Sequence, residues 1–492
     1  AVADANSDGR ANLWCSSQGH FQMRAYTATV LGVSPGNIKV TAAEIGGGFG
    51  GKTVIYLEPL AVRLSQRAGR PVKLVMDRDE VFRATGPTSG TRIKVKMGAT
   101  KDGKMTAAEV WMAYEAGAYA GSPVGAAGMT AIACYDIPNF VVEGYDVVCN
   151  KPRVAAYRAP GAPMAAFAVE SVVDELARNL EIDPIDIRLA NAAVEGTQAS
   201  YGPKFPRIGF VETLEAIKDH PNYSEELGPN QGRGVSAGFW FNAGMMSSAT
   251  VHINENGTAT VVTGSPDIGG SRQSMALMAD EELGIPYESI KPVVADTETV
   301  GFNDVTGGSR VTLATGAAVV DACRLVVEDL RSRAAKTWDV ELDQVEWVEG
   351  QAQHIDGAQP PLSLGDLAKK SGRTGGPISA NASLNSRGVG AGFSSQLCDV
   401  EVDPETGVTR GIRYLTAQDA GRAISPDYVE GQMQGGSVQG IGWALNEEYY
   451  IENDGSMANT SFLDYRMPTA LDMPNIDVIP VSYTHLTLPT KA

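Results

Sequence analysis

The feature that most restricts the fold of this chain is a run of five glycines within six positions, residues 46–51, followed by Lys52. Without Cβ atoms, backbone N–H groups can approach a planar or anionic ligand closely. The pattern of apolar residues predicts a strand at 38–43 and a helix at 53–68. We therefore expect a strand, a ligand-binding glycine loop and a helix, with the positive end of the helix beside the loop.

The same residues permit a second interpretation. Gly46, Gly48 and Gly51 fit the spacing Gly-x-Gly-x-x-Gly, and Asp77 follows a predicted strand at 72–76. That layout is typical of a dinucleotide-binding fingerprint with an acid for the ribose, and it would indicate a NAD-dependent dehydrogenase. The strand before the glycines is too polar for a buried parallel strand, which disfavours this alternative. A structural turn without a ligand is a third possibility.

The rest of the chain alternates predicted hairpins with predicted helices. Alternating apolar residues around turns rich in Gly, Asn or Asp predict hairpins at 95–114, 251–263, 400–414 and 449–462. Helical periodicity predicts helices at 164–180, 274–283 and 315–335. The predicted fold class is α+β with mainly antiparallel or mixed sheets, and the predicted domains are 1–215 and 230–480.

Composition narrows the class of protein. The net charge of −18 argues against nucleic acid and against anionic membranes as partners. The five cysteines include no Cys-x-x-Cys pair, so the chain encodes neither a zinc ribbon nor an iron–sulfur loop. No apolar stretch reaches the ~18 residues of a membrane span. We expect a cytoplasmic protein, because the cysteine pattern suits a reducing compartment.

Further loops of small residues point to one large ligand. They lie at 306–310 and 435–442, and Arg158 stands just before the predicted helix at 164–180. Several such loops in one chain suit an extended polar ligand that is held from many sides, such as a pterin with a phosphate tail. Arg158 could be a surface residue or could pair with an anionic part of that ligand.

These segments together resemble a known family. The carrying segments are Gly-Gly-Gly-Phe-Gly-Gly-Lys at 46–52, Ala-Tyr-Arg-Ala-Pro-Gly-Ala-Pro at 156–163, Thr-Gly-Gly-Ser-Arg at 306–310, Asp-Ala-Gly-Arg-Ala-Ile-Ser-Pro at 419–426 and Val-Gln-Gly-Ile-Gly at 438–442. In this order, from about residue 14 to about residue 481, they resemble the molybdopterin-binding large subunits of the xanthine dehydrogenase, aldehyde oxidase and carbon monoxide dehydrogenase family.

The resemblance implies large mixed-sheet and helix domains that enclose a molybdenum–molybdopterin cofactor, either plain or as the cytosine dinucleotide. It implies cofactor contacts from Gln18, Gly47, Gly48, Phe49, Gly50, Arg158, Ile268, Gly269, Gly270, Ser271, Gly307, Gly308, Ser309, Arg310 and Gln439. Many family members carry Gln where this chain has Gly270. The metal would be held by the pterin dithiolene and not by side chains.

The resemblance also implies an activity and partners. The family hydroxylates small molecules with water as the oxygen source, and electrons leave through a small [2Fe-2S] subunit and a medium FAD subunit. Three departures narrow the substrate: Ala159 replaces the Cys of copper-containing enzymes, Thr53 the Glu of xanthine enzymes, and Pro160 their Phe. An aldehyde or a nitrogen heterocycle remains. A non-catalytic protein that only assembles the other subunits is the other alternative.

The ends of the chain lead to one more expectation. The catalytic Glu of the family lies in a Gly-x-Gly-Glu loop, and no such motif follows Gly442. Residues 482–492 have no counterpart in the family. We expect a chain that is truncated at both ends, with a non-native tail at 482–492, an unknown catalytic base beyond the truncated C-terminus, and no turnover by this polypeptide alone.

Overall fold

The computed structural model describes residues 1–386 and 390–484, which form two compact units. Unit 1 combines residues 1–75 with 243–386, and unit 2 combines residues 76–242 with 390–484. Each unit therefore takes one segment from the first half of the chain and one from the second. Both units therefore contain residues from before and from after the predicted domain boundary near residues 215–230.

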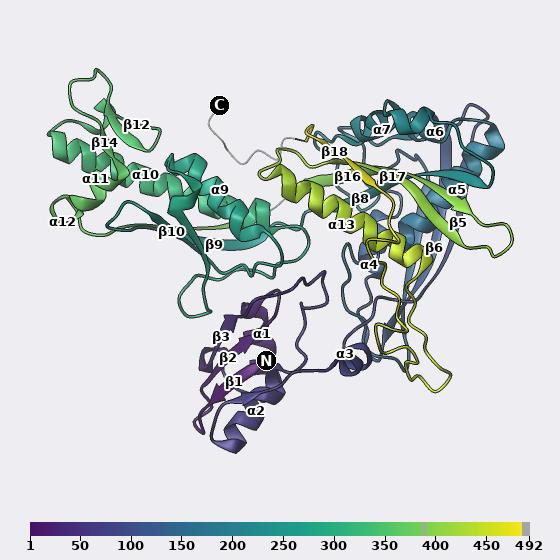
Figure 1. Ribbon diagram of the computed structural model, residues 1–492, viewed down its shortest axis with the longest axis horizontal. Coiled ribbons are helices and arrows are strands. Elements are labelled where there is room, and N and C mark those ends of the chain that lie inside the picture. Colours follow the sequence, from purple (N-terminus) through teal and green to yellow (C-terminus); the bar gives the residue numbers. More distant parts are fainter. Residues whose placement is uncertain (387–389, 485–492) are drawn as a thin grey trace. The chain divides into compact units, whose positions relative to one another are not determined.

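The first layer of unit 1 is a small mixed sheet with two helices on it (Figure 1). Its strand order is β3-β2-β1-β4, with bounds β1 Val2–Ala5, β2 Ala11–Cys15, β3 Ile38–Ala42 and β4 Val72–Lys73. The helices are α1 (His20–Leu31) and α2 (Glu58–Ala68). The inward residues of the strands, such as Leu13 and Val40, are fully buried against them.

A second sheet in unit 1 has the strand order β11-β10-β9-β15 and carries the long helices α9 and α10 (Figure 1). The bounds are β9 Met245–Ile253, β10 Ala259–Thr263, β11 Ile290–Val294, β15 Ile378–Ser386, α9 Ser271–Leu283 and α10 Gly316–Trp338. A π-helical turn at Val311–Thr315 leads into α10. Beside it lie β12 Val345–Val348, β13 Gln351–His354, β14 Leu362–Ser363, α11 Leu364–Lys369 and α12 Ser371–Thr374.

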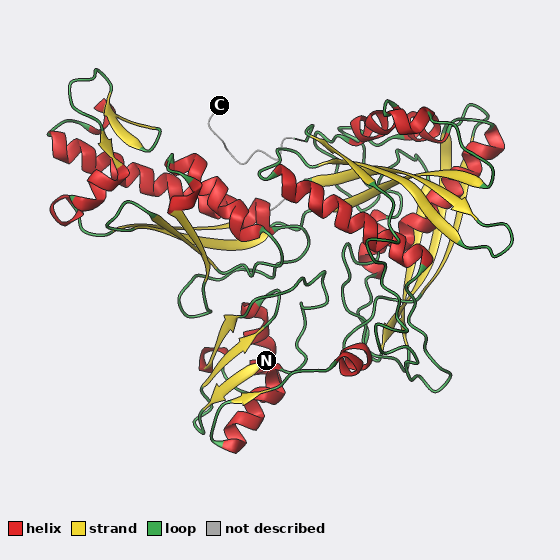
Figure 2. Cartoon of the chain, in the orientation of Figure 1, coloured by secondary structure: helices red, strands yellow, loops and turns green. Residues whose placement is uncertain are grey.

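Unit 2 consists of two sheets with helices packed on them (Figure 2). One sheet has the order β5-β6-β7, with bounds Thr91–Ala99, Met105–Gly117 and Phe140–Val148. The other has the order β18-β17-β16-β8, with bounds Ile476–Val481, Thr409–Asp419, Ala391–Val402 and Gln231–Phe241. The helices are α3 Arg78–Ala84, α4 Val124–Thr130, α5 Ala162–Leu180, α6 Pro184–Asn191, α7 Phe210–Lys218, α8 Pro221–Ser224 and α13 Pro426–Leu445. One apolar core, which includes Phe210 and Phe393, joins both sheets to their helices.

The α+β class is confirmed, and so are three of the four predicted hairpins. β5–β6, β9–β10 and β16–β17 are antiparallel pairs around the predicted turns. The fourth, at 449–462, is wrong: only an isolated bridge joins Ile451 to Met457. Its turn residues are present, but a turn between two short half-exposed segments buries too little to hold a strand pair.

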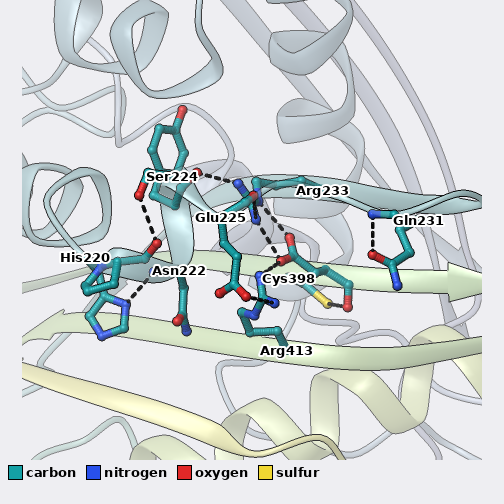
Figure 3. A network of polar contacts seen from close by, with 12 residues as sticks. His220, Asn222, Ser224, Glu225, Gln231, Arg233, Cys398 and Arg413 are labelled. Carbon is teal, nitrogen blue, oxygen red and sulfur yellow. Dashed lines mark hydrogen bonds and ion pairs between the residues drawn. The ribbon is translucent and has the colours of Figure 1, made fainter.

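Ion pairs around a buried carboxylate join strands β8, β16 and β17 (Figure 3). Asp399 on the central strand β16 is fully buried and accepts hydrogen bonds from Arg233 on β8 at 2.7 Å and from Arg413 on β17 at 2.8 Å. Arg413 also pairs with the half-exposed Glu225, in the segment before β8, at 3.2 Å. A buried carboxylate needs such partners, because an unpaired charge in the interior is costly.

Candidate functional site

The glycine run lies in a loop at residues 44–53, the first loop, which follows the edge strand β3. Gly47, Phe49 and Gly50 have φ values of +94°, +51° and +104°. Residues in this left-handed region turn the chain tightly and favour glycine. The helix does not begin at residue 53 as predicted. Instead α2 begins at Glu58, so its positive end does not lie at the glycines.

Gln18, which is almost fully buried just before α1, holds two loops together. Its Oε1 accepts hydrogen bonds from the N–H groups of Gly50 at 3.0 Å and of Lys52 at 3.1 Å. Its Nε2 donates to the carbonyl of Thr306 at 2.7 Å. A Cβ at Gly48 would lie 2.5 Å from Gln18 Oε1, so that position requires glycine. The predicted bond from Gln18 to a cofactor stays a prediction, and its amide is already committed to these loops.

Asp267 organises the second loop, residues 264–272, at the N-terminus of α9. Its carboxylate accepts N–H hydrogen bonds from Gly269 at 2.8 Å and from Ser271 at 3.1 Å. It also accepts from the backbone and from the guanidinium of Arg272, both at 3.1 Å. Burial alone would raise the pKa of Asp267, but these donors lower it on balance. The positive end of α9 is therefore already neutralised by a carboxylate of the chain itself.

Arg310 is the last residue of the third loop, residues 303–310, and its side chain lies in the protein interior. The side chain is 1% exposed and donates to the carbonyls of Gly244, Asp304 and Met246 at 2.7–2.9 Å. Burial lowers the pKa of Arg310 to about 10, and the charge of Asp304 opposes only part of that shift. The resemblance led us to expect a contact between this residue and the cofactor. In the structure its guanidinium binds backbone carbonyls of its own loop and two at or next to the start of β9.

The three loops also contact one another in unit 1. Thr306 donates its hydroxyl to the carbonyl of Pro266 at 2.8 Å, which joins the third loop to the second. Arg272 pairs with Glu44 at 2.5 Å, which joins the second loop to the first. The sequence-predicted residues of these loops, Gln18, Gly47, Gly48, Phe49, Gly50, Ile268, Gly269, Gly270, Ser271, Gly307, Gly308, Ser309 and Arg310, are thus brought together in one unit.

The other two predicted residues, Arg158 and Gln439, meet in unit 2. The Arg158 guanidinium donates to Gln439 Oε1 at 3.2 Å and to the carbonyl of Gln432 at 2.7 Å. Both glutamines lie on α13, where Gly436 leaves room for the guanidinium: a Cβ there would lie 3.4 Å from its Cζ. Burial lowers the pKa of Arg158, and no carboxylate of the described residues pairs with it.

Arg158 borders a cleft of about 460 Å³ within unit 2. Tyr157 and Trp443 are in contact beside it, with ring centroids 4.9 Å apart and ring planes tilted by 47°. The cleft is lined by Tyr157, Arg158, Pro163, Ala166, Phe167, Glu170, Ser171, Asp174, Val235, Ser236, Ala237, Gly238, Gln396, Gly436, Gln439, Gly440 and Trp443. Aromatic walls with a few polar groups are typical of a small-molecule site.

Sequence reasoning missed two residues that shape these sites. Asp267 carried a usable signal, because an Asp shortly before a helix start often accepts the first free N–H groups of that helix. Gln432 carried none, since its contact with Arg158 depends on the packing of α13 in unit 2. Both act on residues that the resemblance had already selected.

The structure contradicts the dinucleotide-binding alternative. In such a fold the strands before and after the glycine loop lie side by side and parallel, and a helix begins at the glycines. Here β3 and β4 lie at opposite edges of the sheet, and β4 pairs antiparallel with β1. The spacing of Gly46, Gly48 and Gly51 matched by composition alone, because five glycines in six positions satisfy many patterns.

The comparisons with known proteins agree with this geometry. Residues 1–192 and residues 213–474 match two families that are each described as a molybdopterin cofactor-binding domain. The chain belongs to the molybdopterin cofactor-binding family.

Two relatives and one solved structure illustrate the likeness. The xanthine dehydrogenase molybdenum-binding subunit of Escherichia coli O157:H7 is 30% identical, over 97% of this chain and 67% of that protein. The nicotine 6-hydroxylase large subunit of Paenarthrobacter nicotinovorans is 29% identical, over 96% of this chain and 63% of that protein. The quinoline 2-oxidoreductase of Pseudomonas putida 86 shares the fold, with a TM-score of 0.90, 24% identity, and coverage of 99% and 67%. The chain thus spans about two thirds of the length of these proteins.

The residues of unit 1 fit a molybdopterin cofactor. A Cβ added at Gly46 or at Gly269 would meet no atom within 4 Å, so the loops present open glycine surface that a flat ligand can approach. Among the described residues, no three His, Cys, Asp or Glu side chains are grouped to hold a metal ion. No helix in residues 1–386 or 390–484 is long and apolar enough to cross a membrane.

Proposed function

We propose that this chain is the cofactor-binding part of a large subunit of a molybdenum hydroxylase that oxidises an aldehyde or a nitrogen heterocycle, with water as the oxygen source. The observation that carries the proposal is the set of hydrogen bonds of Gln18, which places the first and third loops around one point. Those loops are the segments that the family uses around its cofactor. When bound, a molybdenum cofactor supplies the redox centre at which the substrate carbon is oxidised.

The residues of the chain have distinct tasks in this proposal. In unit 1 the glycine loops present backbone N–H groups to the flat pterin, and Gln18 and Arg310 keep those loops in shape. In unit 2 Arg158 and Gln439 present polar groups beside an aromatic wall, which suits a flat substrate with one polar atom. Thr53 uses its hydroxyl to bind the carbonyl of Gly50 at 2.8 Å, so no carboxylate of the first loop faces a purine at that position.

The finer parts of the proposal concern the cofactor form and the partners. We propose that the pterin carries the metal through its dithiolene, in the plain or the cytosine dinucleotide form. Separate subunits with [2Fe-2S] clusters and FAD would receive the electrons, because the five cysteines include no cluster motif. The chain would act in the cytoplasm, and its relatives are themselves named as subunits.

The test is the cofactor content of the purified chain. The 492-residue chain would be produced in a bacterial host that makes molybdopterin and, as a control, in a host that cannot. Metal analysis and the fluorescence of oxidised pterin should both show close to stoichiometric cofactor only from the first host, and nucleotide release by acid would identify the dinucleotide form. A folded chain from the first host without molybdenum and without pterin would contradict the proposal and favour a non-catalytic assembly role.

A matched pair of variants tests the part of unit 2. Gln439→Ala should lower the cofactor content or the activity of the assembled enzyme, while Gln434→Ala on the same helix should change neither. The side-chain amide of Gln434 donates an exposed hydrogen bond to Glu430, one turn away on α13. Equal behaviour of the two variants would show that the Arg158–Gln439 contact is not part of the site.

A further inference from the structure

The three loops of unit 1 contain three cationic side chains, and two of them are already neutralised or saturated. Arg310 is buried and donates to the carbonyl of Asp304 in its own loop and to two carbonyls at or next to the start of β9. Arg272 pairs with two carboxylates, Asp267 at 3.1 Å and Glu44 at 2.5 Å. Arg310 would have to give up these backbone partners to meet an added anion, and the charge of Arg272 is already balanced by two carboxylates.

The third cation is Lys52, at the end of the glycine run. Its backbone is held on both sides, since its N–H donates to Gln18 Oε1 at 3.1 Å and its carbonyl accepts from Gln18 N–H at 2.9 Å. Its side chain is half-buried, and within residues 1–386 and 390–484 no hydrogen bond or ion pair involves its ammonium group. Burial lowers the pKa of Lys52 and no carboxylate offsets that shift.

A helix end does not offer an alternative binding place for an anion here. The N-terminus of α9 lies in the second loop, but the carboxylate of Asp267 accepts the N–H groups of Gly269 and Ser271. The helix after the first loop, α2, begins six residues beyond Lys52. Among the cationic side chains of the three loops, Lys52 is therefore the one whose charge is still available to an added anion.

We propose that the Lys52 ammonium is the group in unit 1 that binds the phosphate of the pterin cofactor. This inference rests on the proposed function, because it takes the cofactor as the ligand of the loops. It adds Lys52 to the residues that the resemblance selected, among which Arg310, the only cation of Gly307–Arg310, is buried and bonded to backbone carbonyls. A phosphate beside a half-buried ammonium replaces the water that the ion would otherwise need, which suits a lysine that has no carboxylate partner among the described residues.

The first experiment measures how much cofactor each variant carries. Lys52→Met, Lys52→Arg and the control Lys101→Met, in the exposed β5–β6 turn of unit 2, would be purified from a molybdopterin-producing host. Lys52→Met should carry roughly tenfold less pterin and molybdenum than wild type, which corresponds to loss of one charge-assisted hydrogen bond. Lys52→Arg and Lys101→Met should stay near the wild-type content. Thermal unfolding of each variant shows that the loss does not come from misfolding.

The second experiment keeps this inference separate from the proposed function. The chain from a host without molybdopterin would be titrated with pyrophosphate by calorimetry, and Lys52→Met should bind it roughly tenfold more weakly than wild type. If wild type carries no cofactor, the proposed function fails, while weaker pyrophosphate binding by Lys52→Met still supports Lys52 as a phosphate-binding residue. If wild type does carry the cofactor, an unchanged cofactor content in Lys52→Met overturns the inference. This holds even if pyrophosphate binding falls, since Lys52 would then bind only a free phosphate. Unchanged binding in both experiments overturns it as well.

Discussion

The polar side chains of the two units behave differently, although the resemblance selected both sets for the same task. In unit 1 Gln18, Asp267 and Arg310 are buried or nearly so, and the bonds described for them all go to the chain. In unit 2 Arg158 bonds, within residues 1–386 and 390–484, to two glutamines and borders an open cleft. Buried, mutually bonded groups hold the shape of a site, whereas partly exposed groups remain available to a ligand. The comparison separates residues that build a site from residues that can contact its ligand.

The largest expected effect on stability comes from removing a buried side chain that holds the loops of unit 1 in place. Arg310→Met should lower the free energy of unfolding by roughly 4 kcal/mol, because it leaves several buried carbonyls without a donor. Arg158→Met, the matched change in unit 2, should cost about 1 kcal/mol, since its partners can turn to water. Urea unfolding followed by circular dichroism measures both. Equal losses of unfolding free energy in the two variants would show that the buried Arg310 and the cleft residue Arg158 contribute alike to stability.

The next largest effect tests whether the fit of the first loop to Gln18 is tight. Gly48→Ala places a Cβ 2.5 Å from Gln18 Oε1, which cannot move without losing its bonds to Gly50 and Lys52. We expect a loss of about 2 kcal/mol and a fall in cofactor content. Gly46→Ala is the control for stability, because a Cβ there meets nothing of the chain within 4 Å and its φ is not positive. If Gly46→Ala lowers the free energy of unfolding as much as Gly48→Ala, steric fit to Gln18 is not the reason for glycine.

A buried histidine in unit 1 should make the stability of the chain depend on pH. Burial lowers the pKa of His20 from 6.5 to about 4, with Asp296 opposing and Arg24 reinforcing the shift, and neither ring nitrogen has a partner among the described residues. The unfolded chain then binds the proton more readily than the folded chain between about pH 4 and 6.5. Stability is therefore complete above pH 6.5 and falls as the pH drops, by roughly 2 kcal/mol between pH 7 and 5.

The measurement compares the pH dependence of unfolding in three proteins. Against wild type, His20→Gln should flatten the curve between pH 7 and 5, while His252→Gln, an exposed ring on β9, should leave its slope unchanged. The common titration of carboxylates cancels in the difference. A His20→Gln curve parallel to wild type would mean that His20 titrates normally.

The smallest effect sharpens the description of the unit 2 cleft. Gly436→Ala and Gly440→Ala both replace a glycine inside α13 and should each stabilise the helix by up to about 1 kcal/mol. A Cβ at Gly436 lies 3.4 Å from the Arg158 guanidinium, whereas one at Gly440 meets nothing within 4 Å. Gly436→Ala should therefore gain less stability, by a few tenths of a kcal/mol. Equal Tm values would show that Arg158 is free to move away.

Local features of the fold followed well from the sequence. The three confirmed hairpins have turn residues between strands of period two, and the predicted helix at 164–180 coincides with α5 apart from two residues at its start. The start of α2 did not follow: residues 53–57 form irregular backbone after the glycines, and β-branched residues at 53–55 do not favour a helix. The pair of Ile451 and Met457 shows a different limit, since a turn signal cannot report how much surface its strands will bury.

The candidate site shows the same contrast between what the sequence predicts and what only the folded chain reveals. The sequence by itself determined the family and the positions of the glycine loops, because backbone approach to a large ligand demands small residues at particular places in the chain. Only the tertiary structure decided which of the side chains around them are hydrogen-bonded to the chain itself and which border a cleft. Gln18 and Thr306 are 288 positions apart, and Arg158 and Gln439 are 281 positions apart. Whether a polar group faces a ligand or a carbonyl depends on such distant neighbours, which no local pattern contains.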